Sequence, residues 1–103
     1  AGYWAENGVC AVSATGIGEF IIRAMASFRV ATLVKSGVGI SDAVRQVVDY
    51  VTKLFGPGNI GLIAIDGSGN VASAFNTEVM GRAWSREGMG KVIVAHLPSD
   101  QFP

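Results

Sequence analysis

The stretch that most restricts the fold of this chain is the run Ala11-Val12-Ser13-Ala14-Thr15-Gly16-Ile17-Gly18-Glu19. Small, mostly apolar residues predict a buried strand, and the two closely spaced glycines predict a tight turn leading directly into a helix. Such a junction places the Thr15 hydroxyl and the backbone N–H groups of residues 16–19 at the positive end of a helix dipole, where an anion is stabilised. We therefore expect any chemistry of this chain at this turn.

The remaining sequence predicts helices and strands that are segregated rather than alternating. This order is typical of an α+β fold and not of a doubly wound parallel sheet. Two β-rich runs around a turn of Asp, Gly, Ser and Asn residues predict a β-hairpin. The predicted elements are, in chain order, a strand at 10–14, a helix at 19–34, a helix at 41–55, and strands at 60–65, 71–75 and 91–96.

The two predicted helices differ in how they are expected to pack. The first is apolar around much of its circumference and ends before Gly37, so it is expected to contact neighbours on more than one side. The second has an ordinary amphipathic pattern, with Ser41 as its N-cap and Gly56-Pro57-Gly58 as its stop signal.

Composition excludes several classes of function. Eight basic residues balance eight acidic ones, without the basic cluster that nucleic-acid binding requires. Arg23, Arg29 and Lys35 interrupt the most apolar region, so no membrane-spanning segment is predicted. The single cysteine, Cys10, excludes an internal disulfide and a multi-cysteine metal site, and is expected to pack as a small hydrophobe. No metal, cofactor or signal peptide is predicted, and the default location is the cytoplasm.

The glycine turn has two other interpretations that stay open from the residues alone. Gly16-Ile17-Gly18 could bind a nucleotide phosphate, although Ile21 stands where a third glycine belongs, or it could merely permit a tight turn. Ser13, Thr15 and His96 could form a nucleophile and base, but no Gly-x-Ser-x-Gly motif frames Ser13.

Two further segments carry polar groups. Asp66 and Asn70 have calcium-loop spacing, but the loop is too short and lacks a terminal Glu, which favours a hairpin turn. The segment 76–80 is either a solvated strand end or the polar rim of a pocket whose floor is the Thr15 turn.

Three segments together resemble the plant-type L-asparaginase and isoaspartyl peptidase family of N-terminal nucleophile hydrolases. They are Cys-Ala-Val-Ser-Ala-Thr-Gly-Ile-Gly-Glu-Phe-Ile-Ile-Arg at 10–23, Gly-Leu-Ile-Ala-Ile-Asp-Gly-Ser-Gly-Asn-Val-Ala at 61–72, and Phe-Asn-Thr-Glu-Val-Met-Gly-Arg-Ala-Trp at 75–84. The resemblance runs from Ala1 to about Trp84, and the tail at 85–103 is not distinctive.

The resemblance implies a function for the turn. In this family a precursor cuts itself, and the new N-terminal threonine acts as the nucleophile with its own amino group as base. Thr15 and Gly16 would form the oxyanion hole, with Gly16 also contacting substrate and Gly18 in a supporting role. The substrate class is L-asparagine or β-aspartyl (isoaspartyl) dipeptides, and no cofactor is implied.

One departure limits what this polypeptide is expected to do alone. It begins Ala1-Gly2-Tyr3, whereas the family's catalytic subunit begins with threonine. The resemblance therefore implies that residues 1–103 are a single incomplete domain, the C-terminal part of the catalytic (β) subunit. The nucleophile and the arginine and aspartate that hold the substrate would lie upstream, so the chain alone should be inactive.

The resemblance also implies partners and an architecture. The chain would contribute to a four-layer αββα sandwich and an (αβ)2-type assembly, together with the upstream segment or chain of the same precursor. Such a setting would account for a composition that is half hydrophobic but only 16% charged. The alternative is a non-enzymatic or degenerate member that binds small acids or a protein partner.

Overall fold

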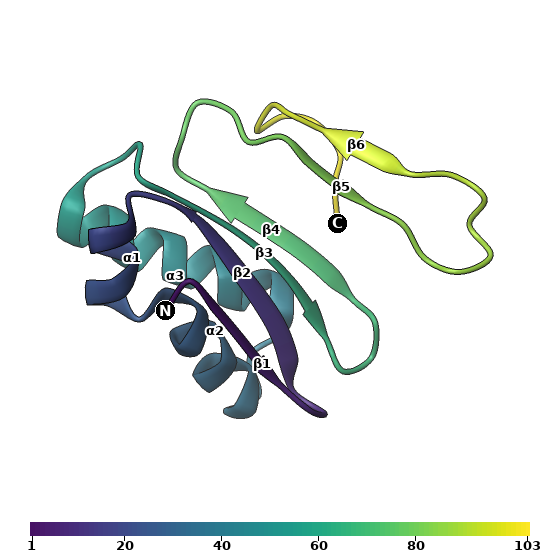
Figure 1. Cartoon of the computed structure of the whole chain (residues 1–103), viewed down its shortest axis with the longest axis horizontal. Helices are drawn as coiled ribbons and strands as arrows, with labels where there is room; N and C mark the ends of the chain where they lie inside the picture. The colour runs from purple at the N-terminus through teal and green to yellow at the C-terminus, as the bar shows by residue number, and fades with distance from the viewer.

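The computed structural model describes residues 1–103 and places an antiparallel sheet against a layer of helices (Figure 1). The sheet has strand order β1-β2-β3-β4, and every neighbouring pair is antiparallel. The predicted α+β class is confirmed, because the three helices are consecutive in the chain and no strands are parallel. The elements are β1 Tyr3–Glu6, β2 Cys10–Gly16, α1 Gly18–Ala24, α2 Ala26–Lys35, α3 Ile40–Phe55, β3 Ile60–Asp66, β4 Val71–Phe75, β5 Arg82–Trp84 and β6 Ile93–Ala95.

The hydrophobic core lies between the helices and one face of the sheet. Helix α2 packs on β1 and β2, and α3 packs on β3 and β4. Alternate strand residues face this core, so Val12 and Ala64 are buried while their neighbours in sequence are not. Cys10 belongs to the same core, and burial raises the pKa of its thiol, as expected for a cysteine that packs as a small hydrophobe.

The opposite face of the sheet has no helix on it. Ile63 and Ile65 point from β3 into this face and remain 48% and 43% exposed. The arm formed by β5 and β6 lies beside β4 and covers only part of this face (Figure 1). The sheet is therefore buried on one face only, although its sequence is apolar on both.

The predicted helix at 19–34 is wrong in one respect, because it is two helices. Met25 adopts the left-handed conformation with φ 49°, the one non-glycine residue in the chain with positive φ. This break lets α1 stack Phe20 on Phe55 at the end of α3, while α2 packs on the sheet. A methionine in the left-handed conformation is locally unfavourable, so tertiary packing must stabilise this break. The sequence gives no signal for it, because no glycine or proline stands at the break.

The ends of the other helices follow local rules to different degrees. Gly37 closes α2 as predicted, since its N–H donates to Val34 and that of Val38 donates to Leu33 in a Schellman motif. The predicted N-cap Ser41 is wrong, because α3 begins one residue earlier at the buried Ile40 and Gly39 takes the cap position. No helix is long and apolar enough to cross a membrane.

Two strands have no counterpart in the prediction. Strand β1 forms a hairpin with β2, and the turn between them contains Asn7-Gly8, a pair typical of tight hairpins. Strand β5 pairs with β6, so the predicted strand at 91–96 exists over 93–95 but lies in a separate two-stranded sheet.

The hairpin of β3 and β4 is confirmed. The carboxylate of Asp66 accepts hydrogen bonds from the backbone N–H groups of Ser68 and Asn70, both at 2.9 Å. The side-chain amide of Asn70 donates to the second carboxylate oxygen of Asp66 at 2.9 Å. These bonds lower the pKa of Asp66, with the Asn70 side chain as the largest cause. The Asp66 carboxylate thus stabilises the hairpin turn.

Candidate active site

Thr15 lies near the end of β2 on the sheet face that carries no helix. The residue opposite it on β3 is Gly61, and the next residue across, on β4, is Phe75. A Cβ built on Gly61 would lie 3.3 Å from the Thr15 methyl carbon and would collide with the Met80 sulfur. Gly61 therefore provides the space in which Thr15 and Met80 approach each other.

The Thr15 hydroxyl is free to bind something outside the chain. The hydroxyls of Thr32, Thr52 and Thr77 each donate to a backbone carbonyl, at 3.0, 2.7 and 2.8 Å. That of Thr15 has no such partner, and the residue is exposed. An exposed hydroxyl on a rigid strand can donate to an oxygen of a bound molecule.

Gly16 occupies a position that only glycine can fill. Its φ is 134°, and an added Cβ would collide with the backbone carbonyl of Asn59. The hydrogen bonds of β2 to its two neighbouring strands determine the direction of the Gly16 N–H. The N–H of Ala14 donates toward β1, to Gly2 at 2.8 Å, and that of Ile17 donates toward β3, to Asn59 at 2.9 Å. Because N–H groups alternate along a strand, Gly16 directs its N–H to the β1 side, beyond the end of that strand.

The predicted row of free N–H groups at residues 16–19 needs correction. The Ile17 N–H is already paired with Asn59, and Ile17 takes the N-cap position without a side-chain cap. Helix α1 has only seven residues, so its dipole is weak. The N–H groups of Gly16, Gly18 and Glu19 have no backbone acceptor, so the turn offers these three donors and the Thr15 hydroxyl.

A hollow of about 410 Å³ lies beside this turn. It brings together the three residues that the sequence singled out, Thr15, Gly16 and Gly18. The N-terminal segment forms one side of it, held by the bond from Ala14 to Gly2. The lining residues are Gly2, Ala14, Thr15, Gly16, Gly18, Ile21 and Ile22.

The segment 76–80 does not form the rim of this hollow, contrary to one of the two interpretations. None of its residues lines the hollow. The Asn76 side chain points inward and accepts hydrogen bonds from the N–H groups of Asn59 and Ile60, both at 2.9 Å. Sequence reasoning missed this buried role, and the only local signal is an asparagine directly after an apolar strand.

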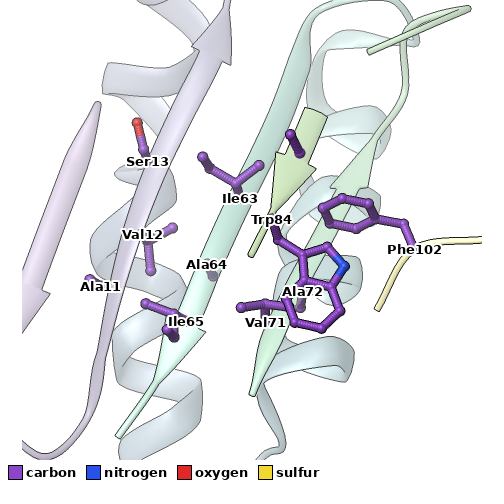
Figure 2. A pocket seen from close by; sticks show the side chains of 11 residues that line it. Ala11, Val12, Ser13, Ile63, Ala64, Ile65, Val71, Ala72, Trp84 and Phe102 are labelled. Atoms are coloured by element: carbon purple, nitrogen blue, oxygen red, sulfur yellow. The ribbon is translucent and has the colours of Figure 1, made fainter. Parts of the chain in front are cut away.

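Ser13 and His96 do not form a catalytic pair with Thr15. Ser13 makes no hydrogen bond to His96, and Figure 2 shows Ser13 on the sheet among apolar side chains. His96 follows β6, where its ring lies against Gly81 and its backbone N–H donates to the Asp100 carboxylate at 2.9 Å. That bond, followed by one from the N–H of Leu97, lowers the pKa of Asp100.

The open sheet face forms a second depression, an apolar groove of about 310 Å³ (Figure 2). In Figure 2 the rings of Trp84 and Phe102 lie over its β4 side, while Ile63 stands between them and Ser13 and Ile65 lies further along the strand. Ten of its eleven lining residues are hydrophobic. Such a surface suits packing and offers little for acid–base chemistry.

A buried arginine that the sequence did not predict joins the β5–β6 arm to the four-stranded sheet. Arg82 is 8% exposed and donates to the Ser73 hydroxyl at 3.1 Å and to the carbonyls of Met80 and Leu97 at 2.9 and 3.2 Å. Its guanidinium also lies over the Phe75 ring, 4.8 Å from the centroid. Arg82 therefore fixes the β5–β6 arm and, through Met80, the neighbourhood of Thr15.

Comparison with known proteins agrees with the resemblance. A protein-family model described as asparaginase matches residues 1–94. A plant-type L-asparaginase of Pyrobaculum calidifontis is 48% identical over 88 residues, which cover 85% of this chain and 29% of that protein. An isoaspartyl peptidase of Escherichia coli is 47% identical over 89 residues, which cover 85% of this chain and 27% of that protein.

A third relative is similar over a comparable share of the chain. A putative isoaspartyl peptidase/L-asparaginase of Dictyostelium discoideum is 41% identical over 85 residues, 82% of this chain and 24% of that protein. The chain thus spans less than a third of the length of these relatives. Since the family match covers nearly the whole chain, the chain belongs to the plant-type asparaginase and isoaspartyl peptidase family.

Proposed function

We propose that this chain supplies the oxyanion-stabilising part of the active site of an amidohydrolase that cleaves L-asparagine or β-aspartyl dipeptides. The observation that carries the proposal is the pair of donors at the end of β2, the free Thr15 hydroxyl and the Gly16 N–H, beside one hollow. The family membership supplies the reaction class.

The proposed step is nucleophilic attack by an N-terminal threonine that lies outside these 103 residues. Its Oγ bonds to the side-chain carbonyl carbon of the substrate, and its proton passes to the free α-amino group. The carbonyl π electrons move to oxygen, and the oxyanion accepts hydrogen bonds from Thr15 and Gly16. The intermediate then collapses, the amine leaves with that proton, and water hydrolyses the acyl-enzyme to release aspartate.

The environment of the two donors suits this role. Gly16 is held by its contact with the Asn59 backbone, and Thr15 stands on a strand paired on both sides. Donors fixed before reaction stabilise developing charge without reorganisation, which is where most of such catalysis originates. Gly18, on the same hollow, is proposed to support the turn and not to contact the oxyanion.

The open sheet face suits the same proposal. In the four-layer fold that the family resemblance implies, a second sheet would pack on Ile63 and Ile65, which are now 48% and 43% exposed. The four-stranded sheet and the helices would then form one sheet layer and one helical layer of a larger domain. The other groups that bind the substrate would come from the rest of that domain.

The test is hydrolysis by the full-length protein after self-cleavage. Aspartate release from L-asparagine and from a β-aspartyl dipeptide is measured for the wild type and for Thr15→Ala. Loss of one oxyanion donor is expected to reduce kcat about 10²–10³-fold. Thr15→Ser retains the hydroxyl and is expected to keep most of the activity, while Ser13→Ala, on the same strand and face, serves as the control.

Two outcomes would contradict the proposal. A wild-type protein that matures but hydrolyses neither substrate would favour a non-enzymatic member that binds small acids or a protein partner. Full activity in Thr15→Ala would remove Thr15 from the oxyanion site while leaving the family assignment intact.

A further inference from the structure

A cluster of asparagine side chains lies directly beneath the Thr15–Gly16 turn without lining the hollow. Asn59 is 2% exposed, and Asn76 is partly buried beside it. Buried amides are costly unless their donors and acceptors are satisfied, so such a pair indicates a specific structural demand.

Asn76 joins three elements through one side chain. Its Oδ1 accepts hydrogen bonds from the N–H groups of Asn59 and Ile60, both at 2.9 Å. Its Nδ2 donates to Asn59 Oδ1 and to Thr52 Oγ1, again at 2.9 Å. The end of β4 is thereby fixed to the start of β3 and to the last turns of α3.

Asn59 transmits this constraint toward the turn. Its Nδ2 donates to the carbonyls of Phe55 and Gly56, at 3.3 and 2.8 Å, which are left unpaired at the end of α3. Its backbone carbonyl accepts the Ile17 N–H at 2.9 Å and packs against the α-carbon of Gly16. Asn59 is therefore held by hydrogen bonds of its side chain and its backbone N–H to Asn76 and to the end of α3. Its backbone carbonyl, in turn, contacts the Gly16–Ile17 turn.

We propose that Asn59 and Asn76 are positioning residues for the oxyanion site: they hold the Asn59 carbonyl against Gly16 and Ile17, so that the Gly16 N–H stays directed into the hollow. This inference rests on the proposed function. Neither side chain touches the hollow, so both act through the backbone of the turn. Misplacement of a reacting or stabilising group by about 1 Å can reduce a rate about 10²-fold.

The first test compares two asparagines in the full-length enzyme. Asn76→Ala removes the partly buried amide, and Asn70→Ala removes an exposed amide at the other end of β3. With active sites counted by titration of the acyl-enzyme burst, kcat of Asn76→Ala is expected to fall about 10- to 100-fold with KM changed less than about twofold. Asn70→Ala should retain both constants. A purely structural role would reduce the number of active sites and leave kcat per site unchanged.

A second measurement does not depend on activity. Hydrogen exchange of the Ile17 amide should accelerate at least about tenfold in Asn76→Ala and not in Asn70→Ala, because the acceptor carbonyl of Asn59 is no longer held. If the wild-type protein hydrolyses neither substrate, the proposed function fails, and this measurement still decides the positioning role. Unchanged exchange at Ile17, or unchanged kcat per site in an active enzyme, would overturn the inference.

A milder pair of variants covers the case in which Asn76→Ala does not fold. Thr52→Val keeps the side-chain shape but removes one of the acceptors of the Asn76 amide, and Thr52→Ser restores the hydroxyl. We expect kcat per site to fall roughly 2- to 10-fold in Thr52→Val and to recover in Thr52→Ser. Equal kcat values in the two variants would contradict the inference.

Discussion

Two turns at opposite ends of β3 show how differently one sheet can hold its loops. The Asp66–Asn70 turn is held from within, since the Asp66 carboxylate bonds to residues two and four positions along the chain. The Thr15–Ile17 turn is held from outside, by Asn59 and Asn76, which lie more than 40 residues later in the sequence. A self-contained turn follows from local chemistry, whereas an externally held turn depends on the whole fold.

The largest expected effect on stability distinguishes Gly16, in the externally held turn, from Gly18, the first residue of α1. Gly16→Ala is expected to cost about 1–3 kcal/mol of unfolding free energy from its φ of 134°, and the collision of the added Cβ with the Asn59 carbonyl raises the total above that of any other variant discussed. Gly18→Ala places its methyl group in open space within α1 and is expected to be neutral or slightly stabilising. Equilibrium denaturation of both variants measures the difference, and equal stabilities would contradict the geometry assigned to Gly16.

The intermediate effect compares one asparagine at each turn. Asn59→Ala removes a buried amide and leaves the carbonyls at the end of α3 without their partner, so the loss of unfolding free energy is expected to be about 1–3 kcal/mol. Asn70→Ala removes an exposed amide whose hydrogen bonds water can replace, so the loss of unfolding free energy is expected to be about 0.5 kcal/mol. Denaturant midpoints for the two variants provide the measurement, and a larger cost at Asn70 would reverse the comparison.

The smallest effect concerns pH at the self-contained turn. The Asn70 side chain and the backbone N–H groups lower the pKa of Asp66 in the folded state. The stabilisation of the folded state by these hydrogen bonds is therefore fully present above the carboxyl pKa of the unfolded chain, about 3.9. It is lost as pH falls through the lower pKa that Asp66 has in the folded state. The stability difference between wild type and Asp66→Asn should shrink between pH 6 and pH 2, as followed by denaturation at each pH. A constant difference would show that the charge on Asp66 does not hold the turn.

Sequence reasoning found the elements whose determinants are local. The hairpin of β3 and β4 follows from its turn residues, and the end of α2 follows from Gly37. It missed the break at Met25, the start of α3 at Ile40 and the pairing of β5 with β6, because each depends on contacts with distant elements. At the start of α3, Gly39 takes the N-cap position without a side-chain cap bond, and Ser41 lies inside the helix next to the buried Ile40.

The candidate site divides in the same way. Thr15 and Gly16 are visible in the sequence as a hydroxyl and a glycine between a strand and a helix, and the family motifs surround them. The asparagine cluster and the buried Arg82 were not visible, because a polar residue gives no sign in the sequence of whether it will face water or the interior. Only the packed fold brings their partners within hydrogen-bond distance.

The sequence by itself determined the family and the α+β class, and it predicted the turn at Thr15–Gly16 as the candidate site, because short local motifs and the order of the elements carry this information. Only the tertiary structure decided which donors at that turn are free. The register of β2 with β3 pairs the Ile17 N–H with Asn59 and directs the Gly16 N–H to the β1 side of the strand. Strand register and buried polar contacts join residues far apart in sequence, so they are settled only when the chain has packed.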